Sequence, residues 1–196
     1  MKDFAGKTIG YSRPGGTSDV ILRLLLPTWN PPPKMVSTGG VPSARTQLMS
    51  GQVDVAWSVP PFNFDLVRKG EARIVFQGGD VAELQNQTIR VSIGGAAALK
   101  SRRDVIRRVV KAYDTALQWM YGKPAESDAL YAKFAEIDIA DATETRKLYS
   151  YEIHQVAKLR SLDLVMQQAI ESKFIANPLT EAELKELIDL VYVPGK

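Results

Sequence analysis

A glycine- and hydroxyl-rich segment, Ser12–Asp19, carries residue types that hold small anions. It follows a predicted strand and begins a predicted helix, so its glycines can turn backbone N–H groups toward a ligand while the helix N-terminus adds a partial positive charge. Gly15, Gly16, Thr17 and Ser18 are therefore candidate ligand-binding residues. No lysine follows the glycines, which excludes a Walker-type phosphate loop. The alternative is that Thr17 or Ser18 only caps the helix and the glycines only make the turn.

A second candidate segment, Gly51–Pro61, combines a helix stop, a buried strand and a proline-opened helix. Trp57 and Ser58 fall at the carboxyl end of this strand, the edge at which open α/β sheets bind ligands. Trp57 can stack on a ligand while Ser58 donates a hydrogen bond, but Trp57 fits a core position equally well. Asp54 lies between two valines, and we expect a structural carboxylate that accepts hydrogen bonds from loop or helix amides.

Three further loops are predicted to leave the same end of the sheet: Thr38–Gly40, Gln77–Asp80 and Gly94–Gly95. Several glycine-rich strand ends at one edge indicate a ligand site better than any one of them alone. Gly40 and Gln77 therefore join the candidate ligand-binding residues. Arg45, close behind the first of these loops, fits either an anion partner or a solvated surface charge.

The composition excludes several other kinds of site. The 196 residues contain no cysteine and a single histidine, His154, so thiolate chemistry, iron–sulfur clusters and histidine-rich metal sites are not expected. We predict no catalytic residue, no metal and no cofactor. The net charge of +3 is small and the acidic residues are scattered among the basic ones, so no nucleic acid is expected as a partner. The basic run Arg102–Lys111 fits either a partner's acidic surface or a solvated helix face.

Elements that position these residues follow from hydrophobic patterning. β-branched runs alternate with helical patterns in the first half, which predicts an α/β class with a mostly parallel sheet and flanking helices. The predicted strands are 7–12, 34–38, 53–57, 72–77 and 88–93, and the predicted helices between them are 18–29, 42–50 and 60–69. From residue 101 onward only helices are predicted, over 101–120, 125–134, 141–156, 161–174 and 180–190. We therefore expect an α/β ligand-binding block over 1–95 and a helical block over 96–196, with a hinge between the two blocks near residues 95–100.

The N-terminus shows no apolar stretch of signal-peptide length and no small-residue cleavage site. The longest apolar runs are far shorter than the ~20 residues that span a membrane. We therefore expect neither a membrane span nor export by the usual signal-peptide route.

A series of short segments runs in a recognisable order along nearly the whole chain: Phe4–Gly10, Gly15–Ser18, Thr38–Gly40, Gln47–Trp57, Pro60–Phe62, Leu99–Asp104, Ala112–Tyr113, Trp119–Tyr121, Lys173–Phe174 and Asn177–Thr180. This order resembles the substrate-binding proteins of ABC importers, in the branch for nitrate, sulfonate or taurine, and thiamine-pyrimidine precursors. The helix–glycine–strand segment around Asp54 is the most specific part of the resemblance.

The resemblance implies a periplasmic-binding-protein type II fold, in which two α/β lobes close on a small molecule. It implies a periplasmic, non-enzymatic protein that delivers a small anionic or heterocyclic solute to an ABC permease. By position, Gly16, Thr17 and Ser18 correspond to the family's anion-holding helix start, and Trp57 and Ser58 to the cleft edge of its second strand.

Members of this family normally carry an export signal and a first-lobe βαβ block before the segment that here begins at Asp3. The resemblance therefore implies a truncated form, with a lobe II-like block over 1–95 and the helical remainder of lobe I over 96–196. Helices built to cover a first-lobe sheet would expose apolar faces without it, so we expect self-association through that surface.

One enzymatic function is excluded, and two alternatives to solute binding remain open. A neighbouring branch that makes the thiamine pyrimidine enzymatically relies on a cysteine-rich motif, and the absence of cysteine excludes that activity here. A sensory or protein-interaction module built on the same lobe is the principal alternative. An α/β enzyme that uses Asp54 or Ser18 is a weaker one.

Overall fold

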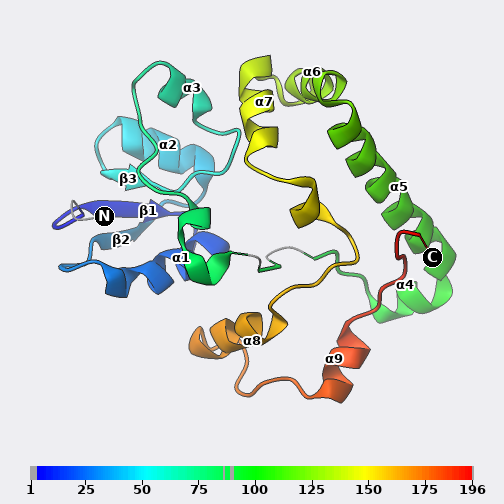
Figure 1. Cartoon of the computed structure of the whole chain (residues 1–196). Coiled ribbons are helices and arrows are strands. Elements are labelled where there is room, and N and C mark those ends of the chain that lie inside the picture. Colours follow the sequence, from blue (N-terminus) through cyan, green and yellow to red (C-terminus); the bar gives the residue numbers. More distant parts are fainter. Residues whose placement is uncertain (1–3, 86, 89–90, 196) are drawn as a thin grey trace. The chain divides into compact units, whose positions relative to one another are not determined.

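The computed structural model describes residues 4–85, 87–88 and 91–195. The chain divides into two units, Met1–Gln85 and Asn86–Lys196, and each has its own internal packing. Within the described residues all strands belong to the first unit, and the second is helical (Figure 1). This confirms the predicted α/β class, in which helices flank a parallel sheet and a helical block follows.

The sheet of the first unit has three parallel strands in the described residues: β1 (Thr8–Tyr11), β2 (Lys34–Ser37) and β3 (Val55–Ala56). The strand order is β2-β1-β3, so β1 is central. Tyr11 at the end of β1 pairs with Ser37 at the end of β2, and Gly10 pairs with Ala56 at the end of β3. All three strands therefore end at one edge.

Helices connect these strands. α1 (Thr17–Leu25) and the 3₁₀ turn η1 (Leu26–Thr28) lead from β1 to β2, and α2 (Val41–Met49) leads from β2 to β3. Because β1 is central, the two crossovers run in opposite directions, and α1 and α2 lie on opposite sides of the sheet (Figure 1). The short helix α3 (Phe64–Arg68) and the 3₁₀ turns η2 (Gly78–Asp80) and η3 (Ala82–Leu84) complete the first unit.

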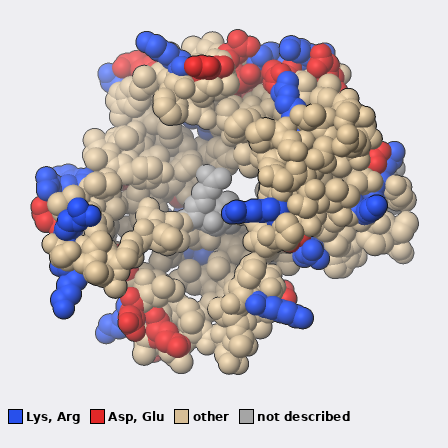
Figure 2. All heavy atoms as spheres, turned by 180° about the vertical axis from the view of Figure 1, so that it is seen from behind, with Lys and Arg blue, Asp and Glu red and all other residues tan. Residues whose placement is uncertain are grey.

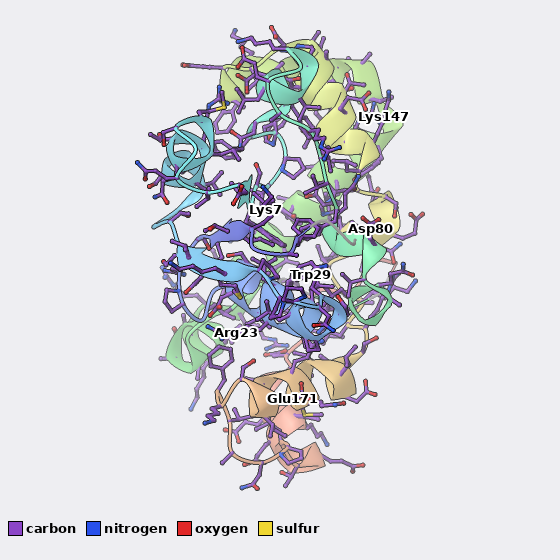
Figure 3. The ribbon with its side chains drawn as sticks, turned by 90° about the vertical axis from the view of Figure 1, so that its left-hand side faces the viewer. Lys7, Arg23, Trp29, Asp80, Lys147 and Glu171 are labelled. Carbon is purple, nitrogen blue, oxygen red and sulfur yellow. The ribbon has the colours of Figure 1, made fainter. Side chains whose placement is uncertain are left out.

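The core of the first unit lies on the α1 side of the sheet. Its buried members are Phe4, Ile9, Tyr11, Ile21, Leu22, Leu25, Trp29 and Val81. Ile9 and Tyr11 alternate along β1 and face the apolar stripe of α1, as a strand period of two and a helix period of 3.6 require. Trp29, labelled in Figure 3, has its ring 5.1 Å from that of Phe4 and 6.0 Å from that of Phe76.

Two of the predicted strands do not form in the described residues. Residues 72–77 form no strand, and Ile74 is 51% exposed while Phe76 packs on the core. β-branched residues favour a pleated surface only where a neighbouring strand offers a ladder, and the segment is held by the Phe76 ring instead. The prediction over 88–93 falls partly outside the described residues, and its described members 88 and 91–93 form no strand.

The second unit consists of six α-helices in its described residues, together with the 3₁₀ turn η4 (Tyr151–His154). The helices are α4 (Ala96–Ser101), α5 (Arg103–Gly122), α6 (Pro124–Ala135), α7 (Ile139–Lys147), α8 (Leu162–Glu171) and α9 (Glu181–Leu187). α6 packs on both α5 and α7, and Leu117, Ala132 and Ala142 are buried there. A partly buried ion pair joins two of these helices: Arg146 Nε and Nη2 donate to the two carboxylate oxygens of the buried Asp128 at 2.7 and 2.9 Å.

Several helix boundaries differ from the predicted ones. The helix predicted over 141–156 ends at Lys147, and beyond its end the Tyr149 carbonyl accepts the Tyr121 hydroxyl at 2.7 Å. The helix predicted over 60–69 begins only at Phe64, since Asn63 before it has a left-handed backbone with φ of 70°. α4 was not predicted at all, and it occupies the segment in which a hinge was expected.

Candidate functional site

The carboxyl edge of the parallel sheet is the candidate site, because the loops after β1, β2 and β3 all leave the sheet there. The first two loops are joined by backbone hydrogen bonds: the Thr38 amide donates to the Tyr11 carbonyl at 2.8 Å, and the Gly39 amide donates to the Ser12 carbonyl at 2.9 Å. On the other side of β1 the Trp57 amide donates to the Gly10 carbonyl at 2.8 Å. Thus three of the predicted loop segments converge.

Gly10 permits the close approach of the β1 and β2 loops. A Cβ at this position would lie 2.7 Å from Cγ2 of Thr38, too close for any side chain. Thr38 is itself buried, and its hydroxyl donates to the Tyr11 carbonyl at 2.9 Å. The pair therefore fixes the spacing of the two loops.

The loop before α1 is held from within by the predicted ligand residue Ser18. The Ser18 hydroxyl is buried, accepts the Ser12 amide at 3.0 Å and lies 2.7 Å from the Ser12 hydroxyl. Gly16 is the N-cap residue of α1, and its amide donates to the Arg13 carbonyl at 3.1 Å. Thr17 by contrast is exposed in the first turn of α1.

Asp19, in the first turn of α1, also bonds to this loop through its side chain. Its Oδ2 accepts the Gly15 amide at 2.8 Å, while its Oδ1 accepts Arg23 Nε at 2.8 Å. An acidic side chain in the first turn interacts favourably with the helix dipole, so it competes with an external anion for the same partial charge. Of the four candidates in this segment, Gly15, Gly16 and Ser18 form hydrogen bonds within the segment, and Thr17 presents an exposed hydroxyl.

The N-terminus of α2 lacks such a competitor. Gly40 is its N-cap residue, with φ of 155°, and Gly39 has φ of 85°, conformations that favour glycine. No side chain caps this helix, and its first turn contains no acidic residue. Ser43 in that turn is exposed, and its hydroxyl accepts Gln47 Nε2 at 3.1 Å. Because Pro42 in this turn has no N–H, the donors at this uncapped helix start are the backbone N–H groups of Val41 and Ser43, and such groups suit an anion.

Trp57 and Ser58 follow β3, as predicted. Trp57 is partly buried and packs against the core cluster, so it is held rigidly at the edge. The Ser58 hydroxyl donates to the Phe62 carbonyl at 2.9 Å and accepts Asn63 Nδ2 at 3.0 Å. Its proton is thus committed within the loop, which leaves one oxygen lone pair as its free capacity.

Arg45 pairs with a carboxylate of its own unit. Its two terminal nitrogens donate to Asp65 Oδ1 and Oδ2 at 2.6 and 2.7 Å, and Nη1 also donates to Asn63 Oδ1 at 3.2 Å. The hydrogen bond from Arg45 lowers the pKa of Asp65 from 3.8 to about 2. The same interaction raises the pKa of Arg45. Arg45 therefore joins α2 to α3.

Gln77 is not placed by a strand, since residues 72–77 form none. It is the N-cap residue of η2, where its backbone amide donates to Asp80 Oδ2 at 2.7 Å. Gly94 and Gly95 likewise follow no strand in the described residues, and they belong to the second unit. Neither loop is brought to the edge by the sheet.

Asp54 has the structural role that the sequence indicates, although it is exposed. Its Oδ2 accepts the Thr8 amide at 2.8 Å and its Oδ1 accepts Lys7 Nζ at 3.1 Å. The Thr8 hydrogen bond first, and the Lys7 ammonium second, lower the pKa of Asp54. The sequence did not predict the role of Asn63, which hydrogen-bonds to both Ser58 and Arg45. The local signal for it is an asparagine, a residue that tolerates a left-handed backbone, shortly after two prolines.

Charges of both signs are interspersed on the face shown in Figure 2. Among the described residues no helix is long and apolar enough to cross a membrane. In the same part of the chain, no group of three or more potential ligand side chains could hold a metal ion.

In a comparison with known families, the chain matches the NMT1/THI5 like model over residues 1–127. Comparison with curated proteins and with solved structures gives no significant match. The matched region includes the whole sheet, the loops at its carboxyl edge and α5. This family is a periplasmic-binding-type domain of ABC transporters, in the nitrate, sulfonate and thiamine-precursor branch, and it consists mostly of substrate-binding proteins. The chain therefore belongs to the NMT1/THI5-like family of periplasmic-binding-type domains.

Proposed function

We propose that this chain is a non-enzymatic substrate-binding component of an ABC importer and binds a small anionic or heterocyclic solute of nitrate, sulfonate or pyrimidine type. The single observation that carries the proposal is the convergence of three strand-end loops at one edge of the sheet in a chain of this family. Open α/β sheets bind ligands at that edge.

The start of α2 is the principal anion-binding element of this proposal. It offers uncapped amides with no acidic residue in its first turn, whereas Asp19 already occupies the start of α1. Thr17 supplies a hydroxyl from the first turn of α1, and Trp57 supplies a ring that packs against the core cluster. The candidates Gly15, Gly16 and Ser18 shape the loop, and Ser58 offers an acceptor.

Family membership supports the cellular role. Proteins of this family are normally periplasmic and pass a small molecule to an ABC permease. We extend both properties to this chain, with residues 1–95 as its lobe II-like ligand-binding part and 96–196 as the hinge and helical remainder of lobe I.

Thermal unfolding with nitrate, taurine, an alkyl sulfonate and hydroxymethylpyrimidine tests the proposal. One of these ligands should raise the unfolding temperature saturably, and ligand at ~100 times its Kd should add roughly 2.7 kcal/mol to the free energy of unfolding. No shift with any ligand, together with capture of a defined protein partner, would favour the sensory or interaction module instead.

Self-association is part of the proposal. In α5 the side chains of Val105, Val109 and Tyr113 recur at helical spacing and are 44%, 63% and 55% exposed. Contiguous exposed apolar side chains of this kind favour a second copy as partner. Light scattering should show mass above that of one chain as concentration rises, and a monomer at high concentration would contradict this part.

A further inference from the structure

Among the described residues, one buried carboxylate of the second unit accepts side-chain hydrogen bonds from neutral groups alone. Asp114 on α5 is 2% exposed, and its Oδ2 accepts Gln118 Nε2 at 2.9 Å and the Tyr192 hydroxyl at 3.1 Å. In the described part of the chain no ion pair includes Asp114. Burial of a carboxylate without a cationic partner is unfavourable. A positively charged group that paired with Asp114 would therefore be bound favourably.

Asp114 lines a hollow of about 270 Å³, together with Tyr151, Gln155, Ala157, Lys158 and Pro194. These residues come from α5, from η4 and the segment after it, and from the C-terminal segment, which the Tyr192 hydrogen bond ties to α5. Tyr151 also lines a neighbouring hollow of about 380 Å³ with Gln118 and Tyr121. The Tyr121 and Tyr151 rings pack edge to face, 5.6 Å apart, and give the wall a fixed aromatic surface.

Lys158 places the opposite charge in the same hollow. Its side chain is exposed, its charge acts on the exposed carboxylate of Glu152, and no ion pair between Lys158 and Asp114 is present among the described residues. A simple amine would form an ion pair with Asp114 but would be repelled by the ammonium group of Lys158. A simple anion would form an ion pair with Lys158 but would be repelled by the carboxylate of Asp114.

We propose that this hollow is a binding site for a small zwitterion of the α-amino acid type, whose ammonium group pairs with Asp114 and whose carboxylate pairs with Lys158. The Tyr151 ring contacts the apolar part of the ligand, and Gln155 supplies an amide for hydrogen bonding. Burial, together with the hydrogen bond to Asp114 and its negative charge, raises the pKa of Tyr192, so the phenol remains a donor to Asp114 and holds it in place.

The proposal is independent of the ligand site at the sheet edge, because every lining residue belongs to Asn86–Lys196. Residues 151–194 also lie outside the region that the family model matches. The two sites can therefore be tested separately on the same protein.

Isothermal titration of the full chain with glycine, leucine, glutamine and phenylalanine is the test. At least one should bind saturably, and the amine and the carboxylic acid matched to the tightest of them should each bind about tenfold or more weakly, since each lacks one charge-assisted interaction. Failure of all four to bind, or equal affinity for the matched amine, would overturn the proposal.

Variants assign the two charges. Asp114→Asn and Lys158→Gln should each weaken binding about tenfold or more, whereas Lys133→Gln, an exposed charge on α6, should leave it unchanged. Tyr192→Phe removes the tether but keeps the charge, and should retain most of the affinity. Should Asp114→Asn unfold the second unit, Lys158→Gln decides, because Lys158 is exposed; unchanged affinity in Lys158→Gln would contradict the assignment.

Discussion

The Ser18 hydroxyl oxygen lies 2.7 Å from the Ser12 hydroxyl and accepts the Ser12 amide at 3.0 Å. One side chain of α1 thus fixes the loop that precedes its own helix. The neighbouring residue Thr17 is exposed. Of these two adjacent hydroxyl residues, Ser18 therefore stabilises the loop, whereas Thr17 faces solvent.

Ser18→Ala should lower the free energy of unfolding by about 1–3 kcal/mol, because it leaves the partly buried Ser12 amide without its acceptor. Thr17→Ala should change it by no more than about 0.5 kcal/mol, but should weaken binding of the solute. Urea unfolding of both variants measures the first quantity. Equal stability losses in the two variants would contradict this division of roles.

Gly10→Ala should destabilise the first unit by about 1–3 kcal/mol, because the new Cβ would meet Thr38 Cγ2 at 2.7 Å. Thr38→Ser removes that methyl group and keeps the hydroxyl, so it should recover a large part of the loss in the double variant. The nearest remaining atom, Val53 Cγ2, is at 3.5 Å, an ordinary contact. A double variant no more stable than Gly10→Ala would show that Thr38 does not set the spacing of the loops.

Acid should destabilise the first unit through Asp65, whose pKa falls from 3.8 to about 2 on folding because Arg45 donates to its carboxylate. A carboxyl group with a lowered folded pKa contributes stability above its unfolded pKa and loses it as the pH falls toward its folded pKa. The loss should therefore occur between about pH 4 and pH 2, and should be smaller in Asp65→Asn. Trp29 and Trp57 fluorescence in a Trp119→Phe background reports on this unit. A variant with the same pH profile as the parent would refute the assignment to Asp65.

Arg146→Met should destabilise the second unit by about 3–5 kcal/mol, since it leaves the buried Asp128 carboxylate without a cation. The hydrogen bond from Arg146 is also the main cause of the lowered pKa of Asp128. Lys147→Met, the neighbouring change at an exposed pair with Glu144, should cost less than about 1 kcal/mol. Circular dichroism during chemical unfolding distinguishes the two, and similar losses would contradict the account.

Local signals predicted much of the fold. Alternation and β-branched residues predicted β1 and β2. Thr180 before Glu181 predicted the start of α9. There the Thr180 hydroxyl accepts the Glu183 backbone amide at 3.3 Å, and the Glu183 carboxylate accepts the Thr180 backbone amide at 2.7 Å. The same β-branched signal was wrong over 72–77. Strand formation there depends on a distant neighbour that the local sequence does not specify.

The candidate site, like the fold, could be predicted from the sequence only in part. Its place at the strand ends could be predicted, because parallel strands bring their carboxyl ends to one edge. The partners of its side chains could not. Arg45 binds Asp65, twenty residues away, and Ser58 binds Asn63, and such choices depend on how α3 packs rather than on residue type.

An amide-resolved NMR titration of the ¹⁵N-labelled chain with nitrate, taurine and hydroxymethylpyrimidine tests the central claim most directly. Saturable shifts should appear at residues 12–18 and 38–43. For an anionic ligand, Ser43→Asp should abolish them because it adds a carboxylate to the first turn of α2, where it also favours the helix, while Ser43→Asn should preserve them. Saturable binding that leaves both loops unshifted, or no binding by any of these ligands, would contradict a solute site at this edge.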